Sequence, residues 1–284
     1  MARPVPAPPA ALAVLLAFTA GYVDTIGFVG LFGLFTSHVT GNFVVMGAMI
    51  AHPLPGLVAK LLALPVFILS VALTTLFVRR WRRAGRNPTP AVLSAQALLL
   101  AAFMAVAVAS GPLVDGDQPM AILAGQFGVL AMAVQNASAR LVFEELSPTT
   151  VMTGNVTQIV IDSVDLWESG GADPTVRTRT LRLLWPIVAF VAGALGGGLA
   201  FAVIALCTTV VAFPLLLDRD VGAAVALLTS ARAVAANPIP MALWGLIVAG
   251  LLFLGALPFF IGLAVVMPVL GHATWHLYRK VVAR

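Results

Sequence analysis

Long apolar runs separated by short polar connections dominate this chain. A bilayer-spanning helix needs roughly 17 to 25 apolar residues. Six runs meet that length, at about 10–35, 57–78, 91–110, 119–139, 183–206 and 240–257. Three shorter runs, at 39–51, 149–161 and 261–277, fit short spans, tilted spans or re-entrant segments equally well. The pattern predicts an all-α polytopic membrane helix bundle with about six to nine membrane segments.

Composition and charge point to the same class. Of 284 residues, 61% are hydrophobic and 10% are charged, and the mean hydropathy is +1.04, so a normal soluble surface is excluded. The net charge of +5 arises from basic residues in short loops beside spans, which indicates positive-inside topology rather than nucleic-acid binding. The single cysteine, Cys207, leaves no disulfide framework or thiolate metal cluster within one chain.

The loops give a partial topology. Five arginines between 79 and 86 predict a cytoplasmic loop, whereas the connection with Asp115 and Asp117 carries no Lys or Arg and fits the outside. We expect the Pro-rich residues 1–9 to be a disordered tail and the run that follows to be a retained first span. The N-terminus lies outside if 39–51 spans the bilayer and inside if that run is re-entrant.

A polar tripeptide, Thr-Gly-Asn, occurs twice in otherwise apolar sequence, at 40–42 and 153–155. Each copy follows a span that contains polar residues: Asp24 precedes Asn42 by 18 positions, and Gln135 and Asn136 precede Asn155 by 20 and 19. The similar offsets predict two related units, about 10–80 and 119–205, each with a broken helix at its triplet. Internal repeats with broken helices are typical of transporters. The alternative is coincidence combined with local packing.

Asp24 is the acidic residue that lies well inside a spanning run. An ionised carboxylate near the bilayer centre costs about 2.5 to 3.5 kcal/mol, so something must offset that cost. The functional interpretation is a proton or cation relay or a substrate contact, and the alternative is a protonated or locally capped carboxyl group. His38 could shuttle protons with Asp24 or serve only as a hydrogen-bonding anchor. Glycines at 21, 27, 30, 33, 193 and 197 indicate close helix packing.

The C-terminal part, 207–284, follows a different pattern. Residues 218–237 predict an amphipathic helix that Asp218 or Asp220 caps and Asn237-Pro238 ends, followed by one or two spans. His272 and His276 have the spacing of two ligands to one metal, but no third ligand accompanies them, so the sequence predicts no metal site. The neighbouring Trp275 and Tyr278 read as an interfacial belt.

The order and spacing of these motifs resemble the YoaK-type family of bacterial multi-pass membrane proteins. The resemblance covers about 10–205 and rests on three strings: AGYVD with SHVTGN (20–24 and 37–42), QNA (135–137) and TVMTGN (150–155). That family is a domain of unknown function, so the resemblance implies a membrane location and a shared motif pair. The tail, 207–284, resembles the C-terminal end of a second uncharacterised membrane protein family, which suggests either a natural fusion or a rearranged or misassembled reading frame.

The leading hypothesis is a permease-like protein of the bacterial inner membrane for a small polar solute, driven by protons or cations. It needs no cofactor or metal, is not an enzyme, and has the lipid bilayer, the solute and a second copy of the chain as partners. The alternatives are a non-transporting scaffold or partner subunit, and an intramembrane enzyme that lacks an evident nucleophile. The predicted solute or coupling site comprises Asp24, His38, Thr40, Gly41, Asn42, Gln135, Asn136, Thr153, Gly154 and Asn155.

Overall fold

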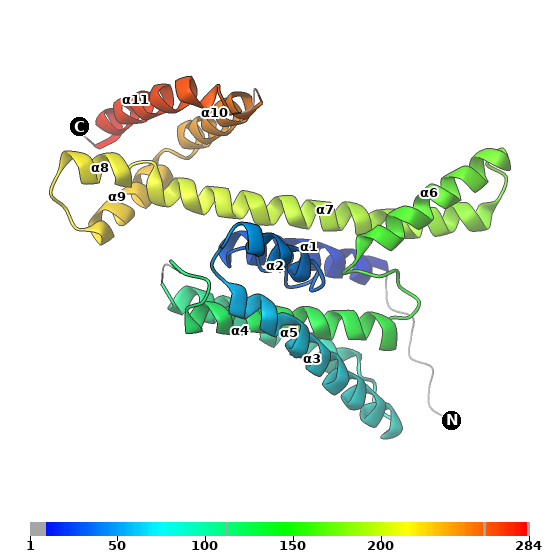
Figure 1. Ribbon diagram of the computed structural model, residues 1–284. Helices are drawn as coiled ribbons and strands as arrows, with labels where there is room; N and C mark the ends of the chain where they lie inside the picture. The colour runs from blue at the N-terminus through cyan, green and yellow to red at the C-terminus, as the bar shows by residue number, and fades with distance from the viewer. Residues whose placement is uncertain (1–9, 112, 258–259, 283–284) are drawn as a thin grey trace. The chain divides into compact units, whose positions relative to one another are not determined.

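The computed structural model describes residues 10–111, 113–257 and 260–282, and all regular structure in those ranges is helical (Figure 1). The predicted disordered tail, 1–9, lies outside the described residues. Contacts divide the chain into residues 1–199 and 200–284, and helix α7 runs through that boundary. The helices are α1 (Ala10–Gly30), α2 (Gly41–Ala51), α3 (Leu57–Arg83), α4 (Thr89–Ala109), α5 (Pro119–Leu141), α6 (Met152–Glu168), α7 (Pro174–Thr209), α8 (Ala212–Asp218), α9 (Ala223–Ala236), α10 (Pro238–Ala256) and α11 (Leu263–Val282).

The predicted membrane helix bundle is confirmed. Within the described ranges, six helical stretches are long and apolar enough to cross a bilayer, at α1, α3, α4, α5, α7 with α8, and α10. They coincide with the six long apolar runs. Helices α2 and α6 have 11 and 17 residues. At 1.5 Å per residue they extend about 16 and 25 Å, which is less than a hydrocarbon core of about 30 Å.

The first span is shorter than its apolar run, because α1 ends at Gly30 rather than near Phe35. Phe32 and Gly33 have φ values of 55° and 80°, the left-handed conformation that terminates helices. The Gly33 N–H donates to the Phe28 carbonyl at 2.8 Å. The chain then turns back toward α1, so apolar sequence continues where the helix does not.

Helices α1 and α5 form the buried centre of the first unit and run antiparallel. The Gln135 amide donates to the carbonyl of Leu16 at 2.8 Å, and the Thr36 methyl group lies against both Gly27 and Gly128. Positions along α1 therefore rise as those along α5 fall. More than half of α5 is buried, including Met132 at 0% exposure.

The segment 31–56, which contains α2, returns to the end of the bundle from which it leaves. At that end the Lys60 ammonium donates to the Phe32 carbonyl at 2.7 Å, and Asp117 accepts from the Gly56 N–H at 3.1 Å. The end of α1 thus lies beside the starts of α3 and α5. At the opposite end, one apolar cluster joins the first turns of α1 and α4 to the last turns of α3 and α5, through Leu16, Val78, Val92, Val134 and Phe143.

The segment 142–173, which contains α6, likewise leaves the bundle and returns to it at the same end, here the end opposite to that of α2. It leaves from the last turn of α5 and leads into α7, whose Arg182 and Trp185 line a pocket with residues 10–14 and 145–147. The start of α7 therefore lies where α5 ends. Neither short helix carries the chain across the first unit.

Glycines bring α1 and α7 into backbone contact, as their spacing predicted. Gly21 packs directly on the carbonyl of Phe190, and Gly193 packs on the carbonyl of Phe18. A side chain at either glycine would occupy the space of a backbone oxygen. Close approach through small residues is a common way for membrane helices to associate.

The second unit corrects one sequence prediction. Helix α9 begins after Gly222, so the expected cap from Asp218 or Asp220 is wrong. Asp218 ends α8 and instead accepts a hydrogen bond from the Tyr278 hydroxyl at 2.6 Å, because that buried phenol needs a partner. Burial, together with this bond, raises the pKa of Tyr278. Pro268 lies inside α11, which continues to Val282.

Candidate functional site

The Asp24 carboxylate organises the segment between α1 and α2. One oxygen, Oδ1, accepts hydrogen bonds from the backbone N–H groups of Thr36 at 2.8 Å and Ser37 at 2.7 Å, and from the Thr36 hydroxyl at 3.3 Å. The residue is 5% exposed. Several donors aimed at one carboxylate stabilise its charged form, which offsets the cost of placing it in an apolar protein. Asp24 therefore lies in a prepared polar niche.

His38 completes the niche on the second carboxylate oxygen. Its Nδ1 lies 2.7 Å from Asp24 Oδ2, and its ring packs edge-on against Phe190. The hydrogen bond to Asp24 raises the pKa of His38, although partial burial of the ring opposes that shift. The His38 side chain is 33% exposed, so the pair has one buried and one accessible partner. This arrangement can hold a proton between the carboxylate and the imidazole.

The two asparagines of the repeated triplet make the same kind of hydrogen bond to the backbone seven residues earlier. Asn42 accepts from the Phe35 N–H at 2.9 Å and donates to the Phe35 carbonyl at 2.8 Å, seven residues earlier. Asn155 donates to the carbonyl of Pro148 at 2.9 Å, also seven residues earlier. Proline has no N–H, so the second copy makes one of the two backbone bonds. Each asparagine holds an extended segment against the first turn of the short helix that follows.

Polar residues of α5 hold the second segment as Asp24 holds the first. Gln135 donates to the Thr149 hydroxyl at 3.0 Å, and Asn136 donates to the Thr150 hydroxyl at 2.9 Å. Thr149 precedes Asn155 by the same six positions that separate Thr36 from Asn42. Gln96 on α4 donates to Gln135 at 2.6 Å and completes the buried network. Sequence reasoning missed Gln96, because no motif marks it.

The two segments meet directly. The Ser37 hydroxyl donates to the Thr150 carbonyl at 3.4 Å, and the two residues are 113 positions apart. That separation equals the distance between the two triplets, so the contact joins corresponding positions of the two copies. Ser37 and Thr150 were not among the predicted site residues. The signal that could have found them is their common place, five residues before each triplet asparagine.

Not all predicted residues join this junction. Asp24, His38, Asn42, Gln135, Asn136 and Asn155 contribute to the two networks. The triplet threonines, Thr40 and Thr153, are exposed, and in the described part of the chain neither hydroxyl has a hydrogen-bond partner. Gly41 packs on the Phe35 ring, whereas Gly154 has open space around it. Of the three residues in each triplet, the asparagine therefore contributes to the junction by hydrogen bonding.

A pocket of about 370 Å³, lined by both polar and apolar side chains, lies beside the second segment. Asn136 and Thr150, which belong to the junction, form part of its wall. Arg140 and Glu144 line the same pocket, and neither makes an ion pair with any described residue. The pocket therefore offers charged and neutral polar groups to a solute next to the place where the segments meet.

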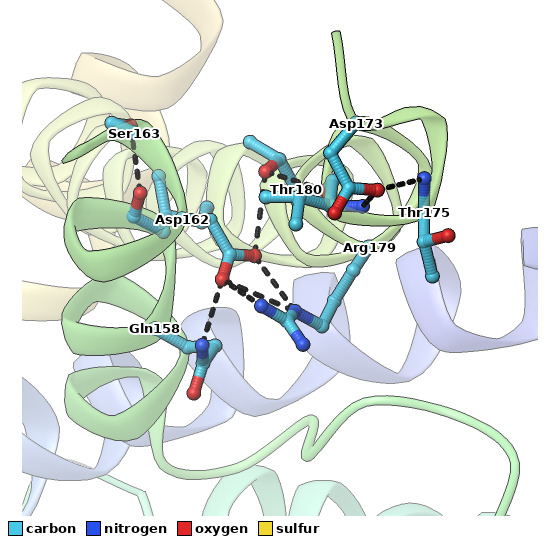
Figure 2. A network of polar contacts seen from close by, with 9 residues as sticks. Gln158, Asp162, Ser163, Asp173, Thr175, Arg179 and Thr180 are labelled. Carbon is cyan, nitrogen blue, oxygen red and sulfur yellow. Dashed lines mark hydrogen bonds and ion pairs between the residues drawn. The ribbon is translucent and has the colours of Figure 1, made fainter. Parts of the chain in front are cut away.

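A separate network fixes α6 to the start of α7 (Figure 2). Arg179 donates from Nε to both oxygens of Asp162, at 3.1 and 3.0 Å, and Gln158 donates to the same carboxylate at 2.7 Å. Asp162 is fully buried, and Thr180 adds a longer contact. Asp162 is buried whereas Arg179 is partly exposed, and loss of the arginine would leave the buried carboxylate without its charged partner, so the network holds the helical hairpin together.

Comparison with known proteins identifies a family. Residues 12–218 match the family described as "Protein of unknown function (DUF1275)". The UPF0700 transmembrane protein YoaK of Bacillus subtilis (strain 168) is 32% identical over 149 residues, which are 52% of this chain and 64% of that protein. The match therefore spans less than two thirds of the length of this relative. No solved structure gives a significant match.

Proposed function

This chain belongs to the DUF1275 family of multi-pass membrane proteins of unknown function, and we propose that it is a permease for a small polar solute. The observation that carries the proposal is the meeting of two broken segments at Ser37 and Thr150, between polar networks on α1 and α5. Non-helical backbone within a membrane bundle is tolerated where protein buries it or where it lines a water-filled cavity. Transporters place their substrate sites at such breaks.

We infer that α1–α3 and α5–α7 are two inverted copies of one unit. Corresponding asparagines bond seven residues back in both copies, and the Ser37–Thr150 contact joins positions separated by the repeat interval. The first helices of the two copies, α1 and α5, run antiparallel. Antiparallel copies related by a two-fold axis in the membrane plane allow a transporter to alternate between two openings.

Charge distribution supports one orientation for the first unit. In the described part of the first unit, nine arginines lie at the end of the bundle where α1 begins. At the opposite end the basic residue is Lys60. The arginines are at 79, 80, 82, 83, 86, 140, 177, 179 and 182. Positive-inside bias then places the start of α1 in the cytoplasm, with α2 re-entrant from the outside.

This orientation predicts the labelling of introduced cysteines in intact cells. With Cys207 replaced by serine, Arg86→Cys should resist a membrane-impermeant maleimide until the cells are permeabilised. Asp115→Cys, in the loop at the other end, should react without permeabilisation. The reverse pattern would contradict the proposed orientation.

The pocket at Asn136 suggests where the solute enters. It lies at the arginine-rich end, and positions 113 residues earlier than its lining residues Glu144 and Pro148 are Leu31 and Phe35. Leu31 is 5% exposed and packs in the central apolar cluster. A pocket therefore lies beside the second copy where the first has a buried leucine, and this difference between the copies supports a carrier that is open to one side.

In this proposal Asp24 and His38 couple solute movement to protons. The carboxylate is held at 2.7 Å from an imidazole that is partly accessible, so a proton can enter through His38. An intramembrane carboxylate with a titratable neighbour is a common element of proton relays. The neutral hydrogen-bonding groups of Ser37, Asn136 and Thr150 would contact the solute.

Uptake into proteoliposomes tests this function. We expect the native protein to accumulate at least one small polar solute from a panel of sugars, polyols, amino acids and organic acids under an imposed proton gradient. Asp24→Asn should abolish accumulation against the gradient but leave exchange at equal concentrations. Gly47→Ala, at an open position on α2, is the matched control and should behave like the native protein.

Two outcomes would contradict the proposal. Equal, solute-independent leakage through native protein and Asp24→Asn would remove the coupling role. Absence of flux for every solute, by native protein that melts cooperatively, would favour a scaffold in which the asparagines only bond backbone to backbone.

A further inference from the structure

Two histidines in the second unit face one another at a distance that fits a shared metal ion. His272 and His276 lie one turn apart on α11, and their Nε2 atoms are 3.2 Å apart. The rings are nearly perpendicular, with an interplanar angle of 85° and centroids separated by 4.7 Å. Both residues are exposed. The two nitrogens therefore converge on one point that solvent can reach.

The separation agrees with coordination geometry. Imidazole nitrogens bind Zn²⁺ at about 2.0 to 2.1 Å, so two of them at a tetrahedral angle lie about 3.3 Å apart. A hydrogen bond between two neutral imidazoles also brings nitrogens to such a distance, but it needs different tautomers, with Nε2 protonated on one ring and Nδ1 protonated on the other. Metal coordination uses the same tautomer on both rings, with each Nε2 unprotonated.

The surroundings leave room for further ligands. The two histidines line a pocket of about 690 Å³ together with Trp244, Pro268 and Lys280. Within the ranges that the structure describes, no group of three or more His, Cys, Asp or Glu residues could hold a metal. A metal at this place would thus take two protein ligands and fill its other positions with water or with a small molecule from the pocket.

We propose that His272 and His276 form an open binding site for a late first-row transition-metal ion, Cu²⁺, Ni²⁺ or Zn²⁺. Imidazole ligands suit these three ions, and the general order of affinity puts Cu²⁺ first. The pocket lining has no carboxylate, so Mg²⁺ and Ca²⁺, which require oxygen ligands, should not bind. The Lys280 ammonium lines the same pocket and weakens binding by repelling the cation. This site is independent of the permease proposal.

The composition of the chain makes a clean test available, because it contains four histidines and one cysteine. Full-length protein, purified through a tag that contains no histidine, is titrated with Cu²⁺ or Ni²⁺ by calorimetry. We expect one ion per chain. His272→Gln and His276→Gln should each lower the affinity at least about tenfold, since one chelating ligand is lost. His52→Gln serves as the matched control and should leave the affinity unchanged.

Two further readouts address the local geometry. Lys280→Ala should tighten binding, and Cu²⁺ should quench part of the tryptophan fluorescence because Trp244 lines the pocket. Failure of native protein to bind Cu²⁺ at neutral pH, or equal binding by His272→Gln and native protein, would overturn the site. Each variant compared with native protein must show the same melting temperature.

Discussion

Replacing Asp24 with alanine is expected to lower the stability of the first unit by roughly 2 to 6 kcal/mol, because two buried backbone N–H groups lose their acceptor. The change leaves the N–H groups of Thr36 and Ser37 without their acceptor, and an unsatisfied buried group costs about 1 to 3 kcal/mol. It also releases His38. Thermal unfolding in detergent, followed by tryptophan fluorescence, measures the effect as a lower midpoint temperature.

Thr40→Ala is the matched control for this prediction. It removes a polar group from the same segment, but that hydroxyl is exposed, so its midpoint should stay within the error of the native value. Asp24→Asn should fall between the two, since one amide oxygen can replace Oδ1 as an acceptor. If Asp24→Ala melted like Thr40→Ala, the carboxylate would not organise the segment 31–40.

The stability series also gives the transport experiment its meaning. A variant that loses both flux and folding says nothing about coupling, whereas Asp24→Asn keeps the Oδ1 position and changes its charge. Loss of accumulation in that variant, with a midpoint near that of Thr40→Ala, would assign the effect to the proton held between Asp24 and His38 rather than to the shape of the segment.

The sequence predicted the spans well because hydropathy reports burial in lipid directly. It overestimated the first span, since Phe32 and Phe35 are as apolar as helical residues and the signal that ends α1 is the Asp24 carboxylate, which draws in backbone from beyond the helix. The apolar residues of this run do not indicate that such a hydrogen bond forms. The break in the helix was foreseeable only from the polar triplet that follows it.

For the candidate site, sequence reasoning found the side chains that stand out in apolar surroundings and missed their partners. Asp24, Asn42 and Gln135 are rare types in such runs, so they attract notice. The missed partners include serine and threonine residues, which are common types, at 36, 37, 149 and 150. Half of the hydrogen bonds that these residues make in the two networks involve a backbone N–H or carbonyl group. Backbone partners depend on the path of non-helical segments, which residue types alone do not specify. Long-range side-chain pairs such as Gln96 with Gln135 and Asp162 with Arg179 were missed because residue types do not specify which faces of two helices pack together.

Gly193→Ala is expected to disrupt the packing of α7 on α1, with the largest loss of stability of any alanine substitution in α7. The new methyl group would overlap the Phe18 carbonyl, which is backbone and cannot rotate away. The helices must separate, and overpacking of this kind typically costs about 1 to 3 kcal/mol or more. Thermal unfolding in detergent gives the size of the effect.

Gly196→Ala is the control on the same helix, because its neighbours are the Tyr22 and Phe18 rings at ordinary contact distance. It should change the midpoint little, and equal melting of the two variants would contradict the close α1–α7 contact. The pair also bears on function. Phe190, on which Gly21 packs, lies edge-on to His38, so separating α7 from α1 removes one wall of the Asp24 niche. Gly193→Ala should therefore impair proton-driven accumulation even under conditions in which the variant remains folded, whereas Gly196→Ala should not.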